Sequence, residues 1–343
     1  MQRLITLILW PLTMWYAVGV AMRNFCFSLG ILRSKPLPVP TVGVGNLAVG
    51  GSGKTPHADY LLALLGRSGR VAMLSRGYRR TSSGFQIDDG RHDPLLLGDE
   101  PAMVAAHHPE ATVAVCADRA EGVARLMALP NPPQAVVLDD VYQHRRVRPT
   151  VNVLLTEYDR PYFRDCIMPY GRLREFRSGR RRADMVVVTK CPPGLTAGQR
   201  AEYARHLGLR KGQQVFFSYL EYGPLQTMDG RPAQVDMQAV RHIVCVTGIA
   251  HPQPLVDELQ RWAPVRHLRY GDHHPFSQTD MAKIRAAYEA VAGEDGIVVT
   301  TSKDAVRLRP LADCVLVAPI RVAFFADGGT SFDEAVTQRL YHS

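Results

Sequence analysis

The stretch Ala48-Val49-Gly50-Gly51-Ser52-Gly53-Lys54-Thr55 decides the fold of this chain. Its glycines let successive backbone N–H groups turn toward a polyphosphate, and its Lys-Thr pair can bind the β/γ oxygens and Mg²⁺. Residues 39–45 predict a strand before the loop, and residues 57–65 predict a helix after it. The strict pattern has glycine where Ala48 stands, and a glycine-rich turn without a ligand is the alternative. With both flanks in place, the stretch predicts a nucleotide-binding loop.

The bulk composition narrows the class of protein. The chain has 343 residues, an apolar share of 46% and a formal net charge of +9. This length predicts two domains or one large α/β domain, and the positive charge favours an anionic partner such as a nucleotide, a nucleic acid, a phospholipid or a phosphorylated substrate. The six cysteines are scattered without a C-x-x-C pair, which favours a reduced compartment over a disulfide framework or a zinc site.

The N-terminus is an apolar segment. Residues 4–22 carry no charge, and as a helix they rise about 28 Å, close to the hydrocarbon thickness of a bilayer. Trp10, Trp15 and Tyr16 favour membrane interfaces, whereas Pro11 would kink a spanning helix. A helix lying in the interface is the favoured interpretation, and a full span or a helix packed on the protein's own core are the alternatives. A signal peptide is disfavoured because no small-residue cleavage site follows.

Short apolar runs alternate with helical patterns, which predicts βαβ units. The expected fold is α/β and P-loop NTPase-like, with a mostly parallel sheet flanked by helices. The first block carries expected strands at residues 39–45, 70–75, 112–116, 135–138, 151–156 and 183–189. A second, smaller α/β domain has expected strands at residues 242–247, 265–270, 297–301 and 314–317, and helices at 253–262 and 278–292.

Two further segments connect these blocks. Residues 214–222 and 317–325 both read as strands and predict a two-stranded linker, and residues 331–341 predict a helix that returns to the first block. The expected division is therefore an N-terminal membrane-associating helix, a nucleotide-binding core completed by the C-terminal helix, and linker strands with the smaller domain. The corresponding ranges are 1–25, then 26–213 with 329–343, and 214–328.

Three acidic or histidine-containing motifs are candidates for chemistry. Val136-Val137-Leu138-Asp139-Asp140 predicts a strand that ends in a magnesium-handling pair, with an ordinary polar turn as the alternative. Gly98-Asp99-Glu100-Pro101 precedes an expected helix at 102–107, where acids often serve only as caps. Asp272-His273-His274 places histidine beside carboxylate, which suits proton relay but also an ordinary surface histidine.

Together these segments resemble one family, the tetraacyldisaccharide 4′-kinases, which are the lipid A 4′-kinases of Gram-negative bacteria. Besides the apolar N-terminus and the nucleotide-binding loop, the marks are Val44-Gly45-Asn46-Leu47, Ser75-Arg76-Gly77-Tyr78, Gly98-Asp99-Glu100-Pro101, Asp118-Arg119, Leu138-Asp139-Asp140, Leu173-Arg174-Glu175, Asp272-His273-His274 and Thr301-Ser302-Lys303-Asp304. This chain departs from the family at Val141-Tyr142, where Gly-Phe is usual, and at Ser302, where glutamate is usual.

The resemblance implies ATP-dependent phosphorylation of the 4′-hydroxyl of a tetraacylated glucosamine disaccharide 1-phosphate, with Mg²⁺, at the cytoplasmic face of the bacterial inner membrane. It implies that Lys54 binds the β/γ phosphates, that Asp99 takes the proton of the sugar hydroxyl, and that His273 pairs with Asp99. The implied metal site consists of Thr55, Glu100, Asp139 and Asp140. The implied substrate or nucleotide cleft is lined by Arg76, Tyr78, Arg119, Arg174 and Glu175. Asp99 lies in the first α/β block and His273 in the second, so we expect closure of the two domains to bring these side chains together.

Two other functions share these features. A membrane-tethered P-loop ATPase or regulatory switch would use the same loop and aspartate pair without a lipid acceptor. A nucleic-acid-binding NTPase is favoured only by the net charge, and the chain contains no RNP, helix-turn-helix or zinc-finger pattern. The sequence therefore predicts a lipid substrate and a membrane surface as partners, and no nucleic acid.

Overall fold

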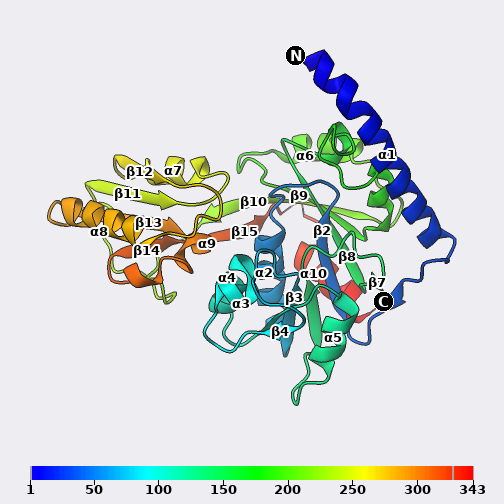
Figure 1. Cartoon of the computed structure of the whole chain (residues 1–343), viewed down its shortest axis with the longest axis horizontal. Coiled ribbons are helices and arrows are strands. Elements are labelled where there is room, and N and C mark those ends of the chain that lie inside the picture. The colour runs from blue at the N-terminus through cyan, green and yellow to red at the C-terminus, as the bar shows by residue number, and fades with distance from the viewer. Residues whose placement is uncertain (1, 327, 343) are drawn as a thin grey trace.

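A computed structural model describes residues 2–326 and 328–342 of the chain. Met1, Asp327 and Ser343, which fall within predicted segments, lie outside the described residues. Figure 1 shows a large sheet with helices packed around it, a smaller sheet at one end of the long axis, and the N-terminal helix α1 extending from the opposite side. The α/β class predicted from the sequence is confirmed.

The larger sheet has nine strands within the described residues, and all neighbours are parallel except the outermost pair at each edge. In spatial order the strands are β15 (Ile320–Phe324), β10 (Gln214–Tyr222), β9 (Met185–Thr189), β8 (Val151–Glu157), β2 (Thr41–Asn46), β6 (Ala135–Leu138), β3 (Val71–Ser75), β5 (Thr112–Val115) and β4 (Gln86–Ile87). The central strands are buried along their whole length, which is why they read as continuous apolar runs in the sequence.

Helices cover both faces of this sheet. On one face, α2 (Lys54–Gly66), α4 (Asp99–His107) and α10 (Phe332–Tyr341) bury their apolar sides against alternate residues of the central strands. On the other face lie α5 (Arg119–Met127) and α6 (Ala197–His206). The predicted C-terminal helix thus does return to the large sheet, where Phe332 stacks on Phe324 with ring centroids 4.2 Å apart.

The smaller sheet has four parallel strands in the described part of the chain, in the order β12 (Val265–Arg269), β11 (His242–Thr247), β13 (Gly296–Thr301) and β14 (Val315–Ala318). Helix α8 (Gln278–Ala292) packs on one face and α7 (Gln253–Leu259) on the other, and α9 (Ser302–Ala305) follows β13 directly. The remaining short elements are β1 (Lys35–Pro36) paired with β7 (Val147–Arg148), helix α3 (Pro94–Leu97), and 3₁₀ turns at Tyr162–Arg164, Arg177–Arg182 and Arg309–Leu311.

Strands β10 and β15 form the predicted two-stranded linker between the sheets (Figure 1). They pair antiparallel from Ser218–Phe324 to Tyr222–Ile320, and β10 also pairs with β9 in the large sheet. The second linker strand is shorter than expected, because Val317 belongs to β14 and Pro319 separates the two strands. Proline lacks the N–H group that a continuous ladder would require.

Two helices begin earlier than the sequence suggested. Helix α2 starts at Lys54, directly after Gly53, and α4 starts at Asp99, directly after Gly98. Both preceding glycines have positive φ, at 81° and 93°, so each provides a turn that side-chain-bearing residues rarely adopt. Lys54, Asp99 and Glu100 therefore lie in first helical turns rather than in loops, where the carboxylates benefit from the helix dipole.

Helix α1 (Gln2–Ser28) contains Pro11 and exposes apolar side chains along its described part. Trp10 is 59% exposed and Trp15 is 78% exposed, and the apolar exposure continues through Met22 and Phe25. No helix of the described residues is long and apolar enough to cross a membrane. The inner side of α1 contacts the large-sheet region, because the Tyr16 hydroxyl donates to the Arg174 carbonyl at 2.8 Å.

Candidate active site

The predicted nucleotide-binding loop connects β2 to α2 at the carboxyl edge of the large sheet. Asn46 Nδ2 donates to Ser52 Oγ at 2.8 Å, and Thr189 Oγ1 donates to the Ser52 carbonyl at 3.0 Å. Burial lowers the pKa of His57 to about 4, so this neutral ring in the first turn of α2 adds no positive charge. Because the first N–H groups of a helix have no acceptor within the helix, the loop presents a preformed anion site.

The two aspartates after β6 differ in their electrostatic environments. Burial, with the negative charges of Glu100 and Asp140, raises the pKa of Asp139 to about 6. Burial opposes ionisation of Asp140 as well, but the nearby cations Lys54 and Arg174 hold the pKa of this carboxyl below its ordinary value. Lys54 Nζ lies 3.8 Å from Asp140 Oδ1, and Arg174 Nη1 lies 3.2 Å from Asp140 Oδ2. The predicted phosphate-binding lysine thus stands beside the carboxyl pair.

The predicted metal ligands converge on this place. Thr55 Oγ1 donates to Glu100 Oε2 at 2.5 Å, and Asp139 Oδ2 accepts from Ser75 Oγ at 3.0 Å, while Asp139 Oδ1 is buried without a partner. Among the described residues, no three His, Cys, Asp or Glu side chains are arranged to hold a metal ion by themselves. Mg²⁺ commonly uses one or two carboxylates together with waters and phosphate oxygens. These side chains offer only oxygen atoms, Asp139 Oδ1 has no hydrogen-bond partner, and the neighbouring carboxylates repel one another. A magnesium ion would satisfy the free oxygen and offset this repulsion.

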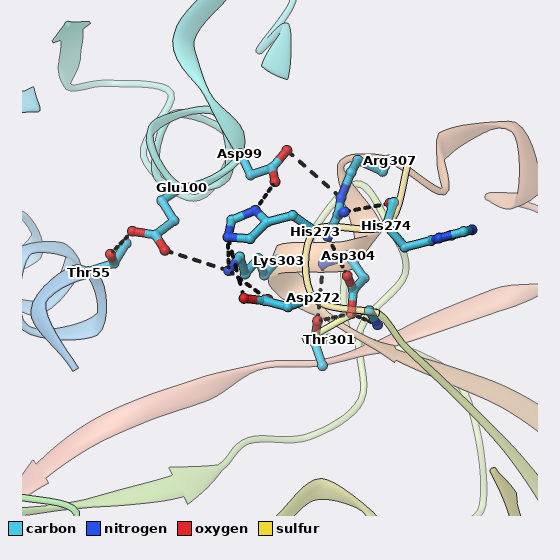
Figure 2. A network of polar contacts seen from close by, with 11 residues as sticks. Thr55, Asp99, Glu100, Asp272, His273, His274, Thr301, Lys303, Asp304 and Arg307 are labelled. Atoms are coloured by element: carbon cyan, nitrogen blue, oxygen red, sulfur yellow. Dashed lines mark hydrogen bonds and ion pairs between the residues drawn. The ribbon is translucent and has the colours of Figure 1, made fainter. Parts of the chain in front are cut away.

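Asp99 and His273 meet across the two sheets (Figure 2). His273 Nδ1 lies 2.7 Å from Asp99 Oδ2, and Arg307 Nε lies 3.8 Å from Asp99 Oδ1. Because a carboxylate only accepts, Nδ1 carries the proton and donates it to Asp99. His274 instead contacts Asp280, with Nε2 2.9 Å from Oδ2. Of the two adjacent histidines, the structure therefore brings His273 to Asp99.

Four of the five predicted cleft residues fall into two groups, and the fifth, Arg174, is half-buried beside Asp140. Arg76 and Tyr78 are exposed, and the Tyr78 ring meets His273 edge-on with centroids 6.3 Å apart. Arg119 and Glu175 are each only 1% exposed. The Arg119 guanidinium donates to the carbonyls of Cys116 and Asp139 at 2.6 and 3.0 Å. It therefore holds the backbone at the aspartate pair from the protein interior.

Glu175 forms a buried ion pair with Arg182, whose Nη1 and Nη2 donate to its two carboxylate oxygens at 2.8 Å each. Glu175 also accepts from Gln143 Nε2 at 3.2 Å, and Gln143 Oε1 accepts from the neighbouring Arg174 at 3.2 Å. Through these bonds Glu175 holds the segment that presents Arg174 to Asp140. Its position fits a supporting role for the site more closely than direct contact from an open cleft.

Two lysines lie at the site without a specific role predicted from the sequence. Lys303 Nζ lies 3.1 Å from His273 Nε2 and 3.7 Å from Glu100 Oε1, so it bridges the pair at Asp99 and the predicted metal site (Figure 2). Lys190 Nζ lies 3.8 Å from the position that a Cβ on Gly51 would occupy, on the nucleotide-binding loop. Lys190 directly follows the end of β9, and this strand-end position makes it a site candidate from the sequence. Lys303 lies two residues after the end of β13, and that position was the signal available for it.

A sequence profile of the family described as Tetraacyldisaccharide-1-P 4'-kinase matches residues 5–341 of the chain. The chain belongs to this family. Curated members include a tetraacyldisaccharide 4'-kinase of Bacteroides fragilis strain YCH46, 41% identical over 308 residues that cover 88% of this chain and 82% of that protein. Another, from Flavobacterium johnsoniae, is 38% identical over 99% of this chain and 98% of its own length.

The fold is also similar to a solved member of the tetraacyldisaccharide-1-P 4'-kinase family. This is the crystal structure of LpxK from Aquifex aeolicus in complex with ATP, which matches with a TM-score of 0.77 and 28% identity. The match covers 99% of this chain and 100% of that one. Family membership therefore extends over the nucleotide-binding loop, the linker strands and the smaller sheet together.

We expect Glu175→Gln to lower the free energy of unfolding by about 2 kcal/mol, because it leaves the Arg182 guanidinium partly buried beside an uncharged partner. Urea-induced unfolding followed by circular dichroism measures this change. The exposed Glu202 on α6 provides the matched control, and Glu202→Gln should leave the midpoint unchanged. Equal midpoints for both variants would show that the buried pair adds no net stability.

Proposed function

We propose that this chain transfers the γ-phosphoryl group of ATP to the 4′-hydroxyl of tetraacyldisaccharide 1-phosphate, giving the 1,4′-bisphosphate of lipid A biosynthesis. The observation that carries the proposal is the contact between Asp99 and His273 beside the nucleotide-binding loop. An ATPase or a switch needs the loop and the metal ligands, but it does not need a carboxylate positioned to accept the proton of an alcohol. Membership in a family named for this reaction supports the same conclusion.

In this mechanism the residues of the chain position charge. Lys54 and the N-terminus of α2 hold the β/γ phosphates and stabilise the charge that develops during transfer. Mg²⁺, held through Thr55 and by Glu100, Asp139 and Asp140 directly or through water, would neutralise phosphate charge. Lys190 is close enough to Gly51 to add a second cation to the phosphate-binding loop.

Asp99 is the residue that activates the acceptor hydroxyl in this mechanism. Its carboxylate takes the proton of the 4′-hydroxyl, while His273 donates from Nδ1 and fixes the orientation of the carboxylate. Lys303 donates to Nε2 of the same ring, which maintains this tautomer. Arg76, Tyr78 and Arg174 would contact the substrate, and Arg119 and Glu175 would support them from the interior.

A pocket of about 400 Å³ beside the end of α1 suits the 1-phosphate group of the acceptor. Its lining includes the basic side chains of Arg23, Arg145 and Arg146, the apolar side chains of Phe27 and Leu32, and one acidic side chain, that of Asp118. We accordingly propose the division expected from the sequence. Residues 1–25 bind the membrane surface at the cytoplasmic face of the inner membrane, residues 26–213 with 329–343 form the kinase core, and residues 214–328 carry the linker and His273.

One assay tests the proposed reaction. Purified protein is incubated with γ-labelled ATP, Mg²⁺ and tetraacyldisaccharide 1-phosphate, and the lipid fraction is separated and counted. Label on the lipid supports the kinase. ATP hydrolysis that proceeds at the same rate with and without the lipid, with no labelled lipid, would instead support the membrane-tethered ATPase or switch.

For the membrane contact, we expect the double variant Trp15→Glu/Met22→Glu to bind anionic phospholipid vesicles at least about tenfold more weakly, because both exposed apolar side chains lose their burial in the interface. Vesicle co-sedimentation measures the binding. Trp262→Glu is the control, since Trp262 is 52% exposed but follows α7 on the smaller sheet. If both changes weaken binding equally, α1 is not the membrane-binding element.

A further inference from the structure

His57 is a buried histidine that the proposed mechanism does not use. It lies in the first turn of α2 and is 2% exposed. Its Nδ1 lies 2.7 Å from the carbonyl oxygen of Gly53, and its Nε2 lies 2.9 Å from Ser218 Oγ. A carbonyl oxygen only accepts, so Nδ1 donates to Gly53 and Nε2 accepts from the Ser218 hydroxyl. The ring thus joins the nucleotide-binding loop to a residue 161 positions later in the chain.

The first of these bonds helps to fix the direction of the Gly53–Lys54 peptide group. In a trans peptide the C=O and the following N–H point to opposite sides. A Gly53 carbonyl held toward His57 therefore directs the N–H of Lys54 to the other side, where a phosphate oxygen would lie. The same carbonyl also accepts the backbone N–H of His57 at 3.1 Å, which is the first hydrogen bond of α2. The imidazole is therefore a second and shorter donor to a carbonyl whose residue has φ of 81° and no side chain to restrict it. Thr189 acts in the same way on the Ser52 carbonyl, which directs the N–H of Gly53.

The second bond anchors the ring to the linker. Ser218 is the first residue of β10 that pairs with β15, opposite Phe324. The Phe324 ring meets the His57 ring edge-on, with centroids 6.0 Å apart. Ser218 also accepts through its carbonyl from the Cys191 N–H, next to Lys190. The histidine is consequently held by both linker strands, which lead to the sheet that carries His273.

We propose that His57 is a positioning residue that orients the Gly53–Lys54 peptide for the β-phosphate of a nucleoside di- or triphosphate, and that Ser218 holds its ring in place. The inference rests on the proposed function only in treating residues 48–55 as a phosphate-binding loop. It assigns the phosphate-binding geometry partly to the linker strands, outside the loop itself.

The test separates the two ring nitrogens. Binding of ADP and AMP is measured by calorimetry or by displacement of a fluorescent ADP analogue. His57→Phe keeps the ring volume and removes both bonds, and we expect ADP affinity to fall about tenfold with AMP affinity unchanged, the loss typical of one well-placed hydrogen bond. His57→Asn places an amide N–H near the Nδ1 position and should restore ADP affinity to within about threefold. His57→Gln reaches only toward Ser218 and should resemble His57→Phe.

Ser218→Ala tests the anchor. Alone it should weaken ADP binding by about threefold, and in the His57→Phe background it should add nothing, since residues that act through one another are not additive. Leu61→Ala is the matched control on the same helix, because Leu61 is fully buried in the core but does not touch the loop. It should lower the thermal midpoint and leave the ratio of ADP to AMP affinity unchanged.

Two results would overturn the inference. One is an unchanged ADP affinity in His57→Phe, and the other is a parallel loss of ADP and AMP affinity, which would indicate only a general loss of structure. Should His57→Phe fail to fold, the comparison of His57→Gln with His57→Asn decides the same question. ADP binding requires no lipid, so a protein that binds ADP as expected but transfers no phosphate would refute the proposed function and leave this inference standing.

Discussion

Lys54→Ala lowers the rate of phosphoryl transfer by about a thousandfold, because it removes a positioned cation from the place where negative charge spreads over the transferring group. The side chain is only 16% exposed and stands 3.8 Å from Asp140 Oδ1, so its charge is poorly screened by water. Single-turnover transfer of labelled phosphate to the lipid measures the effect on the chemical step. Near-normal transfer would refute the assigned role of this lysine.

The remaining contacts make Lys54→Ala interpretable. Arg174 still compensates Asp140, with Nη1 3.2 Å from its carboxylate, so we expect the folded structure to survive. Lys283→Ala on α8 is the control for loss of a lysine, since Lys283 is exposed on the smaller sheet and should leave transfer unchanged. Lys54→Arg retains the charge but not the compact ammonium geometry, and should recover only part of the rate. Together the three variants separate charge, geometry and general effects on the protein.

The sequence predicted the parts of the fold that local patterns specify. Strand β6, with its apolar run and two terminal aspartates, was placed at its observed bounds, as were β10, β11 and α8. The starts of α2 and α4 were missed because Gly53 and Gly98 form turns with positive φ, after which the next residue, Lys54 or Asp99, already belongs to the helix. Glycine in a loop pattern carries no sign of which residue begins the helix.

The contacts of the site were predictable only where a family resemblance supplied them. The Asp99–His273 contact spans 174 residues and the His57–Ser218 contact spans 161. Neither leaves a periodic signal, because the contacts depend on how two sheets and a linker meet in space. The contacts of Arg174 and Glu175 were also not predictable from the sequence. Nothing in Leu173-Arg174-Glu175 indicates that Arg174 contacts the Asp140 carboxylate while Glu175 is buried against Arg182.

Asp99→Asn lowers kcat by about a thousandfold and leaves the affinity for ATP within about threefold, because the amide keeps the shape of the side chain and loses the proton acceptor. His273→Gln should cost less, about tenfold in kcat, since it disturbs the orientation of the carboxylate rather than removing the base. The matched change is His274→Gln, which alters the neighbour that contacts Asp280 and should leave turnover close to that of the unaltered protein.

The double variant Asp99→Asn/His273→Gln decides whether the two side chains act as one unit. If His273 works only by orienting Asp99, the double variant is no slower than Asp99→Asn alone. Multiplied losses would give His273 a separate role, such as contact with the phosphoryl group through Lys303, which lies 3.1 Å from Nε2 and 3.7 Å from Glu100. A collapse of ATP binding in Asp99→Asn would instead place Asp99 with the metal ligands, because Glu100 adjoins it in the first turn of α4. Asp99 acts as a base oriented by His273 only if Asp99→Asn keeps its affinity for ATP and the double variant is no slower than Asp99→Asn alone.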